Sequence, residues 1–266
     1  MKIKLNQLRL YTNGITTFVL LMLSSSLLSA DVFVAGLNAI DRSHYASAYR
    51  SFKPLAENGI AEAQNNLGFL YQNGFGVKRN YNTAIKWYEL AAAQGLPEAQ
   101  HNMGMLNYRG YGLSQSYSHA RRWFTKSANQ GLRDSHYMVG LIFLKGEGTQ
   151  VSPTRAKQHF SKAAKSGDAN AQYMLSHMIA SGDVESNYKT ASTRLSPFDF
   201  ALFTESESNQ LIAALTLSLL ASSNGQKMAD QLVDFLNYQL DDKEIAEAEK
   251  LSEKCLESDY QDCPIF

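Results

Sequence analysis

Glycine recurs along this chain at a fixed interval of 36 residues, and this period constrains the fold more than any other feature. Gly74, Gly110, Gly146 and Gly182 keep the interval. Five further columns share the register: Gly68/Gly104/Gly140, Gly76/Gly112/Gly148, Ala84/Ala120/Ala156, Tyr88/Phe124/Phe160 and Ala92/Ala128/Ala164. Gly59, Gly95, Gly131 and Gly167 close the units. A repeat of this length is typical of a small structural unit that buries its apolar face only by stacking on its neighbours.

Each unit is predicted to hold two helices, for example over residues 62–74 and 80–95. Leu67, Leu70 and Tyr71 recur at the three- and four-residue spacing of a helical face. Both segments stop at glycine, which tolerates the left-handed conformation after a last helical turn. Gly68 falls inside the first helix, where glycine costs about 1 kcal/mol relative to alanine. Its recurrence therefore indicates a close approach of a neighbouring helix, which the small residues Ala84 and Ala92 would also permit.

These columns resemble the Sel1-like repeat, a relative of the tetratricopeptide repeat. The resemblance rests on Ala63, Leu67-Gly68, Tyr71, Gly74-x-Gly76, Ala84, Trp87, Ala91-Ala92 and Gly95, and on their copies one and two periods later, with His159 in the tryptophan column. It implies an all-α, right-handed α-solenoid of helix pairs over residues 44–182. The full units are expected at about 60–95, 96–131 and 132–167, with partial flanking units. The segment 45–59 supplies one flank, and Pro54 is expected to kink or shorten its helix.

The C-terminal third loses the repeat and is expected to cap the solenoid. Residues 183–205 are predicted to form a linker and residues 206–266 a helical cap, with helices over 206–223, 226–239 and 241–257. The pairs Thr204/Glu207 and Asp241/Glu244 have the spacing of a capping box. The chain has two cysteines. In an exported protein Cys255 and Cys263 are expected to form a disulfide, and two free thiols are the alternative.

The N-terminus has the pattern of a secretory signal peptide. Lys2, Lys4 and Arg9 precede an apolar run over residues 15–28, and Ala30 is a small residue at the expected cleavage position. We expect residues 1–30 to be removed and residues 31–43 to form an N-terminal segment of a mature chain without a membrane span. An uncleaved anchor is the alternative. Export to a bacterial periplasm is the expected location, and secretion is also compatible.

Composition and motifs exclude several classes of function. The chain carries 25 basic and 25 acidic residues, whereas nucleic-acid binders usually show a basic excess. The loop of Gly74 and Gly76 joins helix to helix and recurs without its basic residues, unlike a phosphate loop. The six histidines lack the short helical spacing of zinc ligands. Ser186 and Lys189 have a Ser-x-x-Lys spacing without a supporting motif. We therefore expect no cofactor, no metal and no catalysis.

Protein or peptide recognition remains, and the resemblance suggests where it occurs. In tetratricopeptide-type arrays the first helices line a concave groove, and alignment on Leu67-Gly68 gives the equivalent positions. The expected partner-binding residues are Asn65, Phe69, Gln72, His101, Met105, Tyr108, Tyr137, Leu141, Leu144, Tyr173 and His177. Tyr, Met and Phe are favoured where a partner becomes buried. Glu62, Glu98 and Asp134 are expected to form an acidic rim. The second helices, with Lys86 and Arg121-Arg122, are the rival surface.

The sequence thus predicts an exported protein-binding adaptor or regulator, as in exported bacterial relatives of this repeat type. Two alternatives stay open. One is a cell-wall or β-lactam-related hydrolase or a binder of peptidoglycan fragments, and the other is a secreted effector that binds a host protein. The partner and the oligomeric state are not determined by the sequence.

Overall fold

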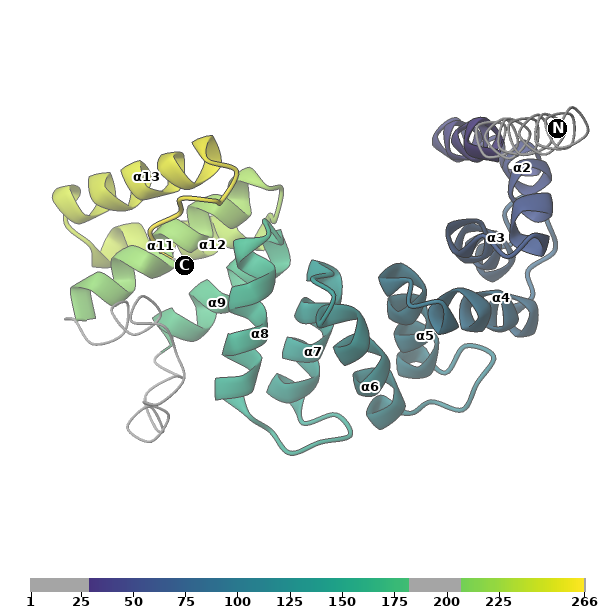
Figure 1. Cartoon of the computed structure of the whole chain (residues 1–266). Helices are drawn as coiled ribbons and strands as arrows, with labels where there is room; N and C mark the ends of the chain where they lie inside the picture. The colour runs from purple at the N-terminus through teal and green to yellow at the C-terminus, as the bar shows by residue number, and fades with distance from the viewer. Residues whose placement is uncertain (1–28, 182–206, 266) are drawn as a thin grey trace, which may run out of the picture. The chain divides into compact units, whose positions relative to one another are not determined.

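The computed structural model describes residues 29–181 and 207–265, and in these residues every regular element is a helix. Residues 29–41 are helical, and the helices that follow are drawn in Figure 1. They are α2 (Tyr45–Glu57), α3 (Ala61–Asn73), α4 (Tyr81–Ala93), α5 (Pro97–Arg109), α6 (Tyr117–Ala128), α7 (Arg133–Lys145), α8 (Pro153–Lys165), α9 (Ala169–Ala180), α11 (Glu207–Ser223), α12 (Met228–Gln239) and α13 (Asp242–Glu257). The expected all-α architecture of consecutively packed helix pairs is confirmed. No helix in the described ranges is both long and apolar enough to cross a bilayer.

The ends of the helices follow local sequence signals. Asn80, Ser116 and Ser152 stand 36 residues apart and begin α4, α6 and α8, where each side chain accepts a hydrogen bond from the backbone N–H three residues ahead. Such N-caps satisfy a donor that the first helical turn leaves unpaired. Gly74 ends α3 with φ of 74°, a left-handed conformation that glycine adopts without strain. Pro54 lies inside α2 and does not cut the helix short.

Within each pair, the two helices meet where a glycine faces an aromatic ring. A Cβ placed on Gly68 would lie 2.8 Å from the ring of Tyr88, and one placed on Gly140 would lie 2.6 Å from the ring of Phe160. Both rings are fully buried. The in-helix glycine therefore creates the space into which the aromatic side chain of the second helix packs, as the small-residue columns predict.

Consecutive pairs are joined by a repeated side-chain hydrogen bond. The amide of Gln64 donates to the carbonyl of Ala56 at 3.1 Å, and that of Gln172 donates to the carbonyl of Ala164 at 3.2 Å. Gln100 repeats the contact with Ala92 at 3.5 Å. Each bond links the end of a second helix to the start of the next first helix. The bonds satisfy buried carbonyls, which would otherwise raise the free energy of the folded state.

The described part of the N-terminal region continues the array of helix pairs. A Cβ on Gly36 would lie 2.6 Å from the ring of Phe52 on α2, so these two residues repeat the glycine–aromatic contact. Gly36 precedes Gly68 by 32 residues rather than 36, because the turn between this helix and α2 is four residues shorter. The helical part of the predicted N-terminal segment 31–43, which ends at Asp41, thus pairs with α2. The predicted signal peptide lies outside the described residues except for Ser29 and Ala30.

At the other end, α11 takes the place of a second helix for α9. Ser176 occupies the glycine column, and its hydroxyl donates to the carbonyl of Ala214 and bonds the hydroxyl of Ser218, both at 2.7 Å. Helices α12 and α13 both pack on α11. Asp241 and Glu244 form the expected capping box at the start of α13. The predicted linker 183–205 and the Thr204 half of the other capping box lie outside the described residues.

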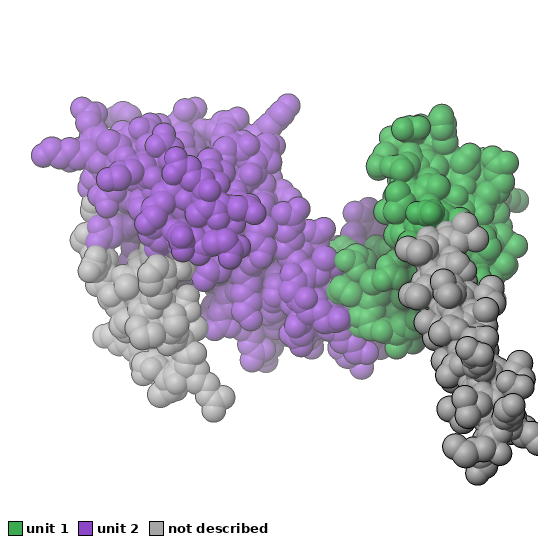
Figure 2. All heavy atoms as spheres, turned by 45° about the horizontal axis from the view of Figure 1, so that its top comes forward, with its two compact units in different colours: residues 1–103 green, residues 104–266 purple. Residues whose placement is uncertain are grey.

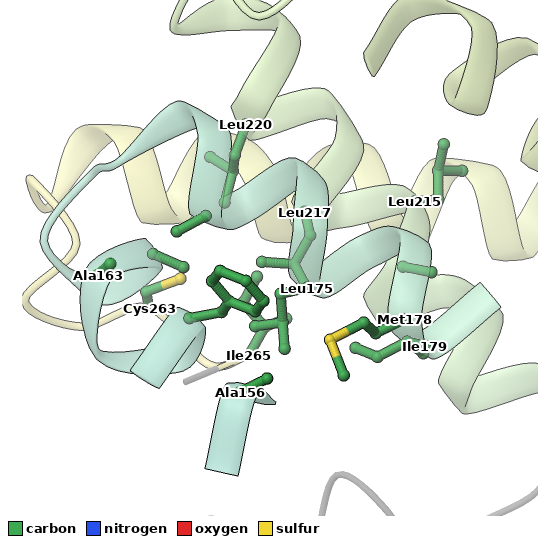
Figure 3. Close-up of a cluster of buried hydrophobic side chains, with 14 of the residues drawn as sticks. Ala156, Ala163, Leu175, Met178, Ile179, Leu215, Leu217, Leu220, Cys263 and Ile265 are labelled. Carbon is green, nitrogen blue, oxygen red and sulfur yellow. The ribbon is translucent and has the colours of Figure 1, made fainter. Parts of the chain in front are cut away.

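The chain divides into two compact units, residues 1–103 and 104–266 (Figure 2). In unit 1 the buried cluster surrounds Phe52, Leu67 and Leu70. In unit 2 a larger cluster contains side chains from α6, α7, α8, α9, α11, α12 and α13 and from the C-terminal residues. Figure 3 shows its central part, with side chains from α8, α9, α11 and the C-terminus: Ala156, Ala163, Leu175, Met178, Ile179, Leu215, Leu217, Leu220, Cys263 and Ile265. A disulfide joins Cys255 to Cys263 and ties the C-terminal residues to this cluster.

Candidate partner-binding surface

In unit 1, two of the expected partner-binding residues form hydrogen bonds inside the chain. The side-chain oxygen of Asn65 accepts a bond from the amide of Asn102 at 2.9 Å. The side-chain oxygen of Gln72 accepts a bond from the hydroxyl of Tyr88 at 3.1 Å. Both residues are half-buried. Their polar atoms therefore stabilise contacts between helices, and only part of each side chain is open to a partner.

Phe69 and His101, the other two positions of unit 1, are also half-buried. The ring of Phe69 meets the edge of Phe75 at a centroid distance of 5.8 Å, and Phe75 stacks on Tyr45 at 4.3 Å. Phe69 thus belongs to an aromatic group that fixes the glycine loop against α2. Its role in packing is established by these contacts, and a role in binding stays a prediction.

In unit 2, the expected residues on α5 and α7 are half-buried and pack against the core cluster. Tyr108 is the most constrained, because its hydroxyl donates to a carboxylate oxygen of Glu147 at 2.7 Å and its ring meets Tyr117 at 5.2 Å. Burial, together with the bond to Glu147, raises the pKa of Tyr108. The remaining residues on these helices are Met105, Tyr137, Leu141 and Leu144. They present apolar and aromatic surface on two consecutive first helices.

Helix α9 carries the most accessible of the expected positions. His177 is exposed and Tyr173 is half-buried. Their rings lie 6.2 Å apart between centroids. Neither side chain belongs to the buried cluster of unit 2, so both can be substituted with little effect on the core.

Two methionines extend this surface and were not among the expected residues. Met138 on α7 and Met174 on α9 are partly buried and pack against the core cluster. They stand one and two periods after Asn102, so a polar column becomes apolar in unit 2. That change is visible in the sequence and marks the two positions. Methionine side chains adapt readily to irregular partner surfaces.

We call the half-buried residues Met105, Tyr137, Leu141, Leu144, Met138, Met174 and Tyr173 of unit 2 the first-helix face. The predicted acidic rim is weak here. Asp134 is exposed, but its carboxylate lies 3.5 Å from the guanidinium of Arg133. Burial of apolar area, rather than charge, is therefore the main contribution that this face can make to binding.

A pair of histidines joins α7 to α8 within unit 2. The Nδ1 atoms of His136 and His159 lie 3.0 Å apart, and His136 also bonds the carbonyl of Ala128. His136 stands in the column of Gln64 and Gln172, so it replaces their amide in the bond between pairs. If its Nε2–H donates to the carbonyl, its Nδ1 accepts the proton of His159, and both rings are neutral.

The surroundings of this pair favour its neutral form. Burial and the charges of His136 and Lys162 lower the pKa of His159 to about 4. Burial and Lys162 also lower the pKa of His136. The pair is a structural bond that holds without charge at neutral pH. Among the described residues, no group of three or more His, Cys, Asp or Glu side chains could hold a metal ion. Ser186 and Lys189 lie outside the described residues.

Comparison with known proteins gives a family and a fold. Residues 61–96, 97–132, 133–168 and 169–191 match the model of the Sel1 repeat. No curated protein matches the chain in sequence. A solved Sel1 repeat protein from Oxalobacter formigenes is 25% identical, with a TM-score of 0.64, over 85% of this chain and 88% of the other.

A second solved structure is a protective antigen of uropathogenic Escherichia coli strains with an SLR fold. It is 27% identical, with a TM-score of 0.66. The similarity covers 90% of this chain but 48% of that one, so this chain spans about half of the antigen's length.

Proposed function

Because residues 61–191 of this chain belong to the Sel1 repeat family, whose solenoids mediate protein–protein interactions, we propose that the protein is a binding adaptor that docks a partner protein segment on the first-helix face. The observation that supports this most is the row of half-buried apolar and aromatic side chains on three consecutive first helices, α5, α7 and α9. Partly exposed aromatic and methionine side chains in a row are typical of surfaces that a partner covers.

The geometry favours a segment with apolar side chains. Within the described residues, Tyr173 packs beside the exposed His177 and does not belong to the buried cluster, so part of its ring can cover an incoming side chain. The half-buried Leu141 and Leu144 already contact the core, and a partner would bury the rest of their surface. Each fully buried leucine-sized side chain contributes about 1.5–3 kcal/mol relative to its exposed state.

Photocrosslinking combined with substitution tests the proposal. A photoreactive phenylalanine analogue at Tyr173 is expected to crosslink one defined partner in the native host, and the same analogue at the exposed Gln158 of α8 serves as the positional control. The double variant Tyr173→Ala/His177→Ala should weaken binding of that purified partner by at least tenfold. The matched control is Tyr111→Ala, because Tyr111 is an exposed tyrosine in the loop after α5.

The comparison of the Tyr173/His177 double variant with the Tyr111 control is informative because none of these three residues belongs to the buried cluster of unit 2. Equal binding by wild type and the Tyr173/His177 double variant would contradict docking on the first-helix face. Thermal unfolding of all variants should coincide within a few degrees, which separates lost binding from lost folding.

We also propose that the chain is exported and cleaved after Ala30. Packing of the described residues supports this position. Against the core of unit 1, the packed side chains begin with Val32 and Phe33, just after the cleavage position. The ring of Phe33 meets Phe52 at 5.5 Å. N-terminal sequencing of the protein from the cell envelope should begin at Asp31, whereas an intact Met1 would contradict cleavage.

A further inference from the structure

The neutral total charge of the chain conceals two opposite charges within unit 2. Residues 104–181 contain ten Lys and Arg against three Asp and Glu, whereas residues 207–265 contain four against twelve. On three helices of unit 2, all charged residues have the same sign. Helices α6 and α8 contain no acidic residue, and α12 contains no basic one. Surfaces of one sign attract ligands of the other sign and accelerate their encounter.

One arginine of α6 and one of α8 lie beside the same aromatic ring. The guanidinium of Arg121 lies 5.8 Å from the ring centroid of Phe143 on α7, and that of Arg155 lies 5.3 Å from the same centroid. Lys126 and Lys162 stand at equivalent, exposed positions one period apart. We call the following residues the basic face: Arg121, Arg122, Lys126, Arg155, Lys162 and Lys165.

Within residues 29–181 and 207–265, no acidic side chain forms an ion pair with the basic face. In the same residues, the Nε of Arg121 is buried without a hydrogen-bond partner. A buried donor without an acceptor raises the free energy of the folded state. The buried Nε is not open to a partner, but the other five residues of the face are exposed, so an incoming carboxylate can pair with them.

A surface that could bind the basic face lies on α12, which carries acidic and exposed aromatic side chains and no basic residue. Asp234 is exposed, Phe235 is 53% exposed and Tyr238 is 87% exposed. Asp234 and Tyr238 are four residues apart, so a carboxylate and an aromatic ring share one side of the helix. Met228 is 59% exposed at the start of the same helix. We call Met228, Asp234, Phe235 and Tyr238 the acidic face.

We propose that the acidic face of one copy of this chain docks on the basic face of a second copy. The carboxylate of Asp234 can then pair with an Arg or Lys side chain, and the exposed rings of Phe235 and Tyr238 can lie against guanidinium groups, which aromatic faces attract. Tyr, Phe, Met and Arg are also the residues enriched at interfaces. Because the two faces differ, the contact is head-to-tail and can extend to further copies.

Charge favours a second copy over an extended anionic partner. A bilayer or a nucleic acid presents negative charge over a wide area, and the net negative charge of residues 207–265 in the same unit would repel it. A single helix such as α12 delivers its charge locally. The proposal concerns the second helices and the cap, so it does not depend on partner docking at the first-helix face.

The test uses two charge-reversed variants of the full chain. Arg122→Glu/Lys162→Glu disrupts the basic face, and Asp234→Lys/Tyr238→Ala disrupts the acidic face; all four side chains lie outside the buried clusters. Sedimentation velocity is run in a neutral detergent, so that the apolar run 15–28 does not associate by itself. Wild type should form concentration-dependent oligomers at about 50 mM salt that dissociate at about 500 mM, because salt screens charge pairs. Each variant alone should associate at least tenfold more weakly.

The mixture of the two variants gives the sharpest result. Each variant keeps one intact face, so the equimolar mixture should form heterodimers and no larger species. Dimers in the mixture also show that the intact face of each variant is folded. A wild type that stays monomeric at about 100 μM, variants that associate like wild type, or a mixture that stays monomeric would each overturn the proposal.

A vesicle-binding assay distinguishes binding of the basic face to an anionic membrane from docking of a second copy. Wild type at monomer concentrations should not sediment with vesicles of phosphatidylglycerol more than the Arg122→Glu/Lys162→Glu variant does. Strong vesicle binding by a wild type that shows no self-association would assign the basic face to anionic membranes and overturn docking of a second copy.

Discussion

At the scale of single residues, the fold depends on contacts between a glycine and an aromatic ring. Gly140 lies inside α7, and its missing side chain leaves the space for the ring of Phe160. A methyl group there would lie 2.6 Å from a buried ring in a packed interior. Such interiors do not absorb extra atoms without movement of backbone or side chains.

Gly140→Ala is therefore expected to destabilise the protein despite the better helix propensity of alanine. Overpacking of this kind costs about 1–3 kcal/mol, and the propensity gain of about 1 kcal/mol offsets part of it. Urea unfolding should show the loss. The double variant Gly140→Ala/Phe160→Leu should lose less than the sum of the two single variants, because leucine leaves room for the methyl group. Strict additivity would contradict the proposed contact.

The histidine pair makes stability depend on pH. The unfolded chain takes up protons near the ordinary histidine pKa of about 6.5, while the folded state keeps His159 neutral down to about pH 4. Between these values the unfolded state binds more protons, so the free energy of unfolding is full above about pH 6.5 and falls as the pH drops toward 4. The contribution is on the order of 1–3 kcal/mol.

His136→Gln should reduce this pH dependence. Glutamine occupies the same column at Gln64 and Gln172, where its amide makes the equivalent bond to a carbonyl. The substitution thus keeps the bond and removes one titrating ring beside His159. Urea unfolding between pH 8 and 5 should show a shallower loss than wild type, with His119→Gln on the exposed side of α6 as control. Equal slopes would contradict the assignment.

Sequence periodicity predicts the glycine and aromatic contacts but not the histidine pair. The columns repeat three times, so their role can be deduced from the spacing alone. His136 and His159 are 23 residues apart on two helices, and each replaces a different residue type of its column. A search for ligands at short spacing within one helix therefore could not find their contact.

At the scale of helices, the ends of the array are completed by segments that break the period. Residues 29–41 pair with α2 through Gly36, but the shorter turn shifts this glycine by four residues. A strict period of 36 residues therefore does not predict its contact with Phe52. At the other end α11 supplies the second helix for α9 with Ala214 and Ser218 in place of an aromatic ring. No repeated position in the sequence predicts that Ala214 and Ser218 replace the aromatic ring.

The C-terminal disulfide should stabilise the last helix and the residues after it. Cys255 and Cys263 are buried in the core of unit 2, and the amide of Asn224 donates to the hydroxyl of Tyr260 between them. Closing a loop of this length contributes about 2–3 kcal/mol by restricting the unfolded chain. Cys255→Ala/Cys263→Ala should lower the free energy of unfolding by that amount. Unchanged unfolding of the oxidised and reduced wild type would show that the bond does not form.

At the scale of the whole molecule, the two units differ in the size of their buried clusters. The cluster of unit 1 contains Phe52, Leu67 and Leu70 among few large side chains, whereas that of unit 2 joins seven helices and the C-terminal residues. In repeat proteins, stability is approximately a sum of local terms and neighbour contacts. The two units need not unfold together.

Native-state hydrogen exchange should reveal this difference. Backbone amides of α2 and α3 are expected to exchange faster than those of α7, α9 and α11, because fewer buried contacts hold them. Mass spectrometry of peptides after deuterium labelling measures both sets in one sample. Equal protection in both units would indicate a single cooperative fold.

Of the binding surface, the sequence alone could locate the helices and the repeat positions that face a partner. It could not show which of those side chains are already used inside the chain. Tyr108 illustrates the difference, since its hydroxyl donates a hydrogen bond to Glu147 in the loop after α7. A tyrosine in a favourable column is thereby tied to the fold, while Tyr173 in a neighbouring column is left available.

The pairing of α9 with α11 has a consequence for the order in which the protein is made. Ser176 contacts Ala214, which is synthesised 38 residues later, whereas Gly140 contacts Phe160, which follows it by 20 residues. A growing chain therefore leaves the ribosome with the apolar side of α9 uncovered for longer than that of any earlier first helix. A message truncated after α9 would yield a protein that keeps this side exposed, which is the kind of surface that chaperones and proteases recognise.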